Sequence, residues 1–138
     1  MLRRWVVLAA LLLPQAAQAA GDPLLAKAVL MKSIAFRTVE GEGQVPALAA
    51  YYASILKEAG FAGAEIEITP MGETAMLAAT IQGSDPQLKP LLMIGHMDVV
   101  AANAADWKRD PFAPVEEKGY IFGRGAEDNK YDVAMMVA

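Results

Sequence analysis

The residues with the greatest capacity for chemistry lie in the stretch "LLMIGHMDVV", residues 91–100. It contains His96, the only histidine of the sequence, and Asp98 two positions later. If the backbone stays extended here, both side chains point to the same side, so the carboxylate can accept a hydrogen bond from one ring nitrogen and leave the other nitrogen free for a metal ion. This spacing favours a metal site, whereas a histidine satisfied by a backbone carbonyl is the ordinary structural alternative.

A second candidate group lies in "GYIFGRGAEDNKYD", residues 119–132. Gly123 and Gly125 permit a tight turn, and Asp128 comes just before a helix that we expect to begin near Lys130. An aspartate at this place can simply cap the helix. Alternatively, its two oxygens can bridge two divalent cations, the arrangement found in two-metal hydrolases.

Two helices are predicted in the first half of the chain. Asp22 followed by Pro23 is typical of a helix N-terminus, and the apolar residues that follow have helical spacing. Residues 45–60 predict a second amphipathic helix, with Gly60 as its C-terminal cap.

Strand patterns follow these helices. Residues 64–69 alternate apolar and acidic side chains, and residues 75–83 also read as a strand. Residues 91–95 form a short, wholly apolar run, which is typical of a central strand covered on both faces and would place His96 at its carboxyl end. We therefore expect an α/β fold, with a mixed sheet and helices on both of its faces. Between the two candidate groups, Trp107 and Phe112 are expected to anchor an irregular surface loop.

Composition limits the classes of function. Residues 1–20 have two arginines, a short apolar run and a small-residue site, the anatomy of a secretory signal peptide, so we expect a periplasmic or secreted protein without stable membrane insertion. Their removal takes away Arg3 and Arg4 and no acid, which leaves ten basic against sixteen acidic side chains. Such an acidic chain is a poor nucleic-acid binder. With no cysteine, any metal must be held by imidazole and carboxylate.

Several motifs in this order carry a family resemblance. "GHMDVV", then "DPF", then "GYIFGRGAEDNK" resemble the zinc exopeptidase and aminoacylase family that includes glutamate carboxypeptidase, acetylornithine deacetylase and succinyl-diaminopimelate desuccinylase. The resemblance implies that His96 binds one zinc ion, that Asp98 has a catalytic role in orienting His96, and that Asp128 bridges two zinc ions. Cobalt or manganese could serve in place of zinc.

The resemblance also implies partners that this sequence lacks. Members use a glutamate pair, a further acidic ligand and a distant histidine, so we expect residues 21–138 to be the N-terminal portion of a truncated catalytic domain, inactive alone. The whole enzyme would hydrolyse amide bonds in peptides or N-acyl amino acids through a two-zinc site, and a homodimer through a missing domain is a further expectation. The alternative is a noncatalytic binding protein that retains the metallopeptidase fold.

Overall fold

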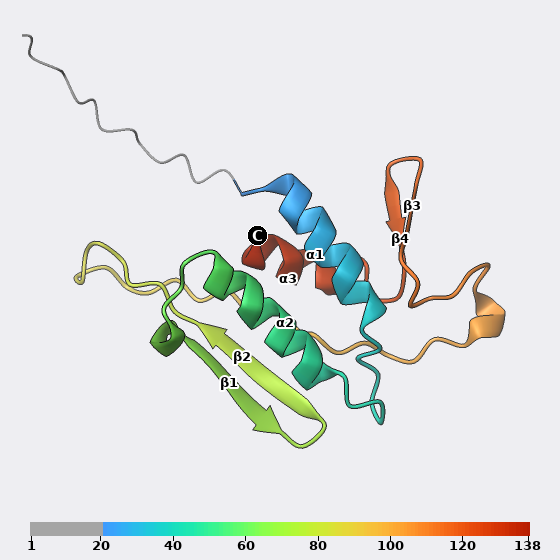
Figure 1. Ribbon diagram of the computed structural model, residues 1–138, viewed down its shortest axis with the longest axis horizontal. Coiled ribbons are helices and arrows are strands. Elements are labelled where there is room, and N and C mark those ends of the chain that lie inside the picture. Colours follow the sequence, from blue (N-terminus) through green and yellow to red (C-terminus); the bar gives the residue numbers. More distant parts are fainter. Residues whose placement is uncertain (1–20) are drawn as a thin grey trace, which may run out of the picture.

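The computed structural model describes residues 21–138, in which helices and two small hairpins form the regular structure (Figure 1). The predicted signal peptide, residues 1–20, lies outside the described residues. Among the helices that are described, none has the length and apolar character needed to cross a membrane.

Both predicted helices are confirmed, together with the predicted start of the first and the predicted end of the second. Helix α1 spans Pro23–Ala35, and the Asp22 carboxylate accepts hydrogen bonds from the main-chain N–H groups of Leu24 and Leu25 at 2.9 and 3.1 Å. Helix α2 spans Val45–Glu58. Gly60 follows it with φ of 101°, which lets the N–H of the next residue reach back into the last turn, as in the common glycine-ended helix.

The core forms where the helices meet. Helices α1 and α2 lie side by side, and α3, Lys130–Val137, packs against α1 (Figure 1). Each helix contributes apolar side chains that are at least nine-tenths buried, and together they form one cluster: Val29, Leu30, Ile34, Leu48, Tyr52, Ile55 and Ala134. This cluster fixes α3, and therefore the segment just before it, relative to the N-terminal helices.

The strands form two antiparallel hairpins. Strands β1, Ile66–Met71, and β2, Thr74–Ala79, pair with each other and pack on α2. Strand β1 begins two residues later than predicted because Gly63–Glu65 form a turn of 3-10 helix, and β2 ends at Ala79 rather than at residue 83. Strands β3, Val115–Glu117, and β4, Tyr120–Phe122, form the second hairpin.

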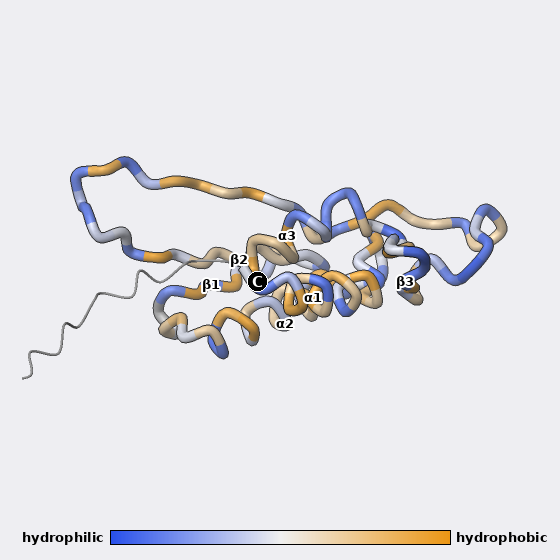
Figure 2. Tube along the Cα trace, turned by 90° about the horizontal axis from the view of Figure 1, so that it is seen from above, coloured by the Kyte–Doolittle hydropathy of each residue, from blue (hydrophilic) through white to orange (hydrophobic). Residues whose placement is uncertain are grey.

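The predicted central strand at residues 91–95 is wrong for the described part of the chain. These residues pair with neither hairpin, and the side chains of Leu91 and Ile94 are 87% and 77% exposed. The apolar run follows a loop that extends away from the helices (Figure 2). An apolar run becomes a buried strand only when neighbouring strands supply hydrogen bonds and helices cover its faces. Within residues 21–138 the α/β character is therefore that of helices with two small sheets, not of one mixed sheet covered on both faces.

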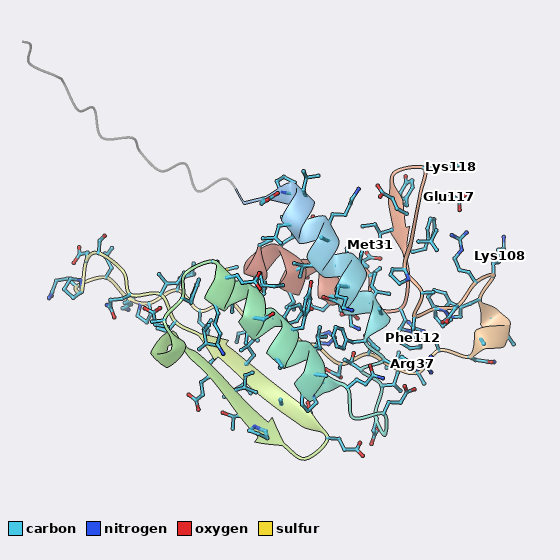
Figure 3. The ribbon with its side chains drawn as sticks, in the orientation of Figure 1. Met31, Arg37, Lys108, Phe112, Glu117 and Lys118 are labelled. Atoms are coloured by element: carbon cyan, nitrogen blue, oxygen red, sulfur yellow. The ribbon has the colours of Figure 1, made fainter. Side chains whose placement is uncertain are left out.

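The loop before β3 is anchored at one of its two predicted aromatic residues. Phe112 is 6% exposed, and the Arg37 guanidinium lies 4.2 Å from the centre of its ring (Figure 3). Trp107 is half-buried, with the Arg124 guanidinium 5.3 Å from its ring centre. The Phe112 contact holds the loop against the segment that follows α1, and the Trp107 contact joins it to the segment that follows β4.

Candidate metal site

Thr38 fixes the segment that carries His96 and Asp98 through two hydrogen bonds. The Thr38 hydroxyl donates to the main-chain carbonyl of Met97 at 2.7 Å, and the Val99 N–H donates to the Thr38 carbonyl at 3.0 Å. Thr38 is fully buried, and Val99 is 7% exposed. The backbone on either side of Asp98 is therefore held even though no strand of the described residues pairs with it.

The turn that presents Asp128 depends on glycine for two different reasons. Gly125 has φ of 78°, a left-handed conformation, and a Cβ built there would lie 2.5 Å from Cγ1 of Val99. At Gly123 no such φ occurs, but a Cβ would overlap Cγ2 of Ile34. The predicted tight turn is thus confirmed at Gly125, whereas Gly123 is required by close packing on α1.

The segment held by Thr38 and the turn at Gly125 bring His96 and Asp128 together. Nε2 of His96 lies 3.0 Å from Oδ1 of Asp128, although 32 positions separate the residues. The two side chains are 49% and 89% exposed, so the pair opens to solvent. The helix-cap alternative for Asp128 is not what is observed, because the residue at the N-cap of α3 is Asn129 and the Asp128 carboxylate is directed at the imidazole.

Asp98 contacts the other ring nitrogen of His96. Nδ1 lies 3.0 Å from the main-chain carbonyl of Asp98 and 3.3 Å from its carboxylate Oδ1. A carbonyl can only accept, so Nδ1 carries the hydrogen. In the neutral imidazole the lone pair is then on Nε2, the nitrogen that faces Asp128. The sequence predicted the carboxylate as the orienting group, and the structure adds the main-chain carbonyl of the same residue.

The charges of the site raise the pKa of His96 above its ordinary value. The main cause is the hydrogen bond with Asp128; partial burial opposes it, and the carbonyl and carboxylate of Asp98 add to it. Without a metal ion, both ring nitrogens of the protonated imidazole can donate, one to each aspartate. A cation at this place would replace the Nε2 proton, because it needs the same lone pair.

Nε2 of His96 and Oδ1 of Asp128 are close enough to serve as two ligands of one ion, and their 3.0 Å separation is also the ordinary length of the direct hydrogen bond between them. Two donors at about 2.0–2.1 Å from a tetrahedral zinc are about 3.3 Å apart, close to the observed 3.0 Å between Nε2 and Oδ1. Imidazole and carboxylate are also suitable zinc donors. In the described residues, however, no group of three or more such side chains is gathered. These residues thus fit part of a metal site, since a protein zinc site ordinarily needs about three ligands.

Two residues next to the candidate site, Asn129 and Lys130, make contacts that the sequence did not predict. Asn129 accepts a hydrogen bond from the His96 N–H at 3.0 Å, and its position just before a helix was a usable signal, because asparagine is common there. Lys130 is fully buried, and its Nζ donates to the carbonyls of Ser33 and Phe36, each at 2.8 Å. No pattern indicated this, because lysine in a helix is ordinarily solvated.

Comparisons with known proteins point to one family. Residues 92–138 match the family model described as Peptidase family M20/M25/M40. The chain is 52% identical over 54 residues to N-fatty-acyl-amino acid synthase/hydrolase PM20D1 of Mus musculus, a match that covers 39% of this chain and 11% of the relative. It is 34% identical over 95 residues to Aminoacylase-1 of Sus scrofa, a match that covers 68% of this chain and 23% of the relative. It is 39% identical over 64 residues to an uncharacterized carboxypeptidase of Schizosaccharomyces pombe, a match that covers 44% of this chain and 11% of the relative. The matched segments thus span less than a quarter of the length of these curated relatives.

Proposed function

We propose, from the match of residues 92–138 to the model of peptidase family M20/M25/M40, that the whole protein is a metal-dependent hydrolase of amide bonds in N-acyl amino acids or peptides. The observation that carries the proposal is the pair formed by Nε2 of His96 and Oδ1 of Asp128, 3.0 Å apart. Both ligands come from the matched segment. The names of the similar proteins, an N-fatty-acyl-amino acid synthase/hydrolase and an aminoacylase, favour N-acyl amino acids.

His96 and Asp128 would hold zinc, in a site for two ions that also accepts cobalt or manganese. When bound, the metal supplies Lewis acidity and lowers the pKa of a bound water toward neutrality. The chain's own residues prepare the ligands. Asp98 keeps the hydrogen on Nδ1 of His96 and the lone pair on Nε2, while the Asp128 side chain, 89% exposed, keeps its second oxygen accessible to a second ion.

We further propose that residues 21–138 are the N-terminal portion of a larger catalytic domain. The matched segments span less than a quarter of the relatives, and the described residues gather fewer than three ligands. The general base and the remaining ligands would come from residues outside this sequence. In that larger domain the apolar run at residues 91–95 would form a strand of a sheet with helices on both faces.

The test is hydrolysis of N-acetyl and N-fatty-acyl amino acids and of dipeptides by the intact protein. We expect turnover that stops on treatment with a chelator and returns with zinc, and that is abolished in His96→Ala. A folded, zinc-loaded protein that binds an N-acyl amino acid but never cleaves it would instead support the noncatalytic alternative.

Export through the signal at residues 1–20 is part of the same proposal. Mass spectrometry of the protein from the exported fraction should give a mature N-terminus near Ala20 or Gly21, because the small residues there suit signal peptidase. An intact Met1 in the membrane fraction would overturn this part and leave the catalytic proposal untouched.

A further inference from the structure

Asn129 joins the two segments that carry the proposed ligands. Its Oδ1 accepts from the His96 N–H at 3.0 Å, and its Nδ2 donates to Oδ2 of Asp132 at 2.8 Å. The two partners fix which way the carboxamide faces. A flipped amide would set Nδ2 against an N–H donor and Oδ1 against a carboxylate, and both contacts would be unfavourable.

Gly95 makes room for this contact. A Cβ built on Gly95 would lie 2.8 Å from Oδ1 of Asn129 and 2.7 Å from Cγ2 of Val133. Any side chain at position 95 would therefore push α3 and the Asn129 carboxamide away from the His96 backbone. The apolar run before His96 thus ends in glycine at a point where Asn129 and Val133 leave no room for a Cβ.

The contact is not an ordinary helix cap. An asparagine that caps a helix accepts from an N–H in its own first turn. Asn129 occupies the N-cap of α3 without such a bond. Its oxygen instead accepts from the N–H of His96, 33 positions earlier in the sequence. The Asp132 carboxylate, exposed in the first turn of α3, holds the other end of the amide.

We propose that Asn129 is a positioning residue, which acts through the main chain of His96 to hold Nε2 at the distance from Asp128 that one metal ion requires, with Asp132 as its anchor. This inference rests on the proposed function. Because Asn129 is adjacent to Asp128 and bonds to His96, its carboxamide links both ligands through backbone on one side and a hydrogen bond on the other.

The direct test is hydrogen exchange at the His96 N–H. In the intact protein with ¹⁵N-labelled histidine, the His96 signal is identified by its loss in His96→Ala. Asn129→Ala should accelerate exchange at this amide by about 10-fold or more, because its acceptor is gone. Asn103→Ala, which removes a carboxamide that accepts locally from the Ala105 N–H, is the matched control and should leave it unchanged.

Cobalt(II) titration of the same proteins gives the second readout. Asn129→Ala should weaken cobalt binding by about 10-fold, the usual effect of losing a group that orients a ligand. Asp132→Ala should weaken it less, and Asp132→Asn, which keeps an acceptor for Nδ2, should restore wild-type binding. These exposed substitutions at Asp132 are expected to fold even if Asn129→Ala does not.

The two proposals fail in distinguishable ways. Unchanged exchange at His96 in Asn129→Ala, or in Asp132→Ala where that variant alone folds, would overturn the positioning role. So would unchanged cobalt affinity in a wild type that binds cobalt. Absence of cobalt binding by the wild type would overturn the proposed function and, with it, the role of Asn129 toward a metal ion. The exchange measurement needs no metal, so it still tests separately whether Asn129 holds the His96 backbone.

Discussion

Asp98 can orient His96 through two oxygens of different kinds. Its main-chain carbonyl lies 3.0 Å from Nδ1 and its carboxylate 3.3 Å. A substitution of the side chain removes only the second of these, so the carbonyl still keeps the hydrogen on Nδ1. The contribution of the Asp98 carboxylate to ligand geometry should therefore be smaller than the sequence alone indicated.

This arrangement orders the effects of three substitutions in the intact protein. Metal content per chain, measured by elemental analysis, should fall most for Asp128→Ala, which removes the proposed bridge, and by about one ion for His96→Ala. It should fall least for Asp98→Ala, with a loss of affinity near the lower end of the roughly 10 to 100-fold typical of orienting partners. If Asp128→Ala retained both metals and full activity, the two-metal proposal would have to be given up.

At the scale of the elements, Lys130 ties the start of α3 to the end of α1. Its ammonium is fully buried and donates to two carbonyls of the last turn of α1 and the residue after it, Ser33 and Phe36. A cation is favourable at a helix C-terminus, where unpaired carbonyls gather. Burial acts in the opposite direction and lowers the pKa of Lys130 to about 8.

The lowered pKa predicts a pH dependence of stability. Above about pH 8 folded Lys130 loses its proton, whereas the unfolded chain keeps it up to about pH 10.5. The unfolded state then binds more protons, so the contribution of Lys130 to the free energy of unfolding rises with pH across this window, by about 3 kcal/mol at most. Urea unfolding gives the free energy of unfolding of wild type and of Lys130→Met at about pH 7 and about pH 10. Between these pH values the free energy of the wild type should rise relative to that of Lys130→Met. A difference independent of pH would contradict the lowered pKa.

Gly125 connects the turn before α3 to the segment that carries the histidine. An alanine there would meet both the positive φ and the Val99 side chain at 2.5 Å. We expect Gly125→Ala to lower the free energy of unfolding by about 2–4 kcal/mol. Gly83→Ala is the control, because its Cβ would meet open space and its φ is not positive, and it should change stability little. Equal effects of the two variants in urea unfolding would show that the close packing at Gly125 is not needed.

At the scale of the whole molecule, the described residues leave the apolar run at residues 91–94 uncovered. Leu91, Leu92, Met93 and Ile94 are each at least 60% exposed and come just before His96 of the candidate metal site in the sequence. Four adjacent exposed apolar side chains are unusual on a stable surface and ordinarily mark a contact with further protein. This agrees with the proposal that residues 91–95 are a strand of a larger sheet.

Hydrogen exchange tests that proposal. Amides of residues 91–95 should exchange quickly in the 138-residue chain, because residues 21–138 offer them no strand partner, and about 100-fold more slowly in the intact protein. Amides of α2, Val45–Glu58, provide the internal reference, because their hydrogen bonds lie within the helix in both proteins. Fast exchange of residues 91–95 in the intact protein would contradict a buried strand.

The sequence by itself determined the local features of this protein. The Asp22 cap, the helix ended by Gly60 and the turn at Gly125 depend on backbone preferences of single residues and their neighbours, and all were predicted. The order of motifs also predicted the family whose model matches residues 92–138. Only the tertiary structure decided which distant groups meet. The Asn129 bond to the His96 backbone spans 33 positions and the Lys130 bonds to α1 span more than 90, so both depend on how the helices pack. Within the described residues the predicted strand at residues 91–95 is absent for the same reason: apolar composition predicts burial, but burial needs neighbouring strands and helices, and the described residues do not provide them.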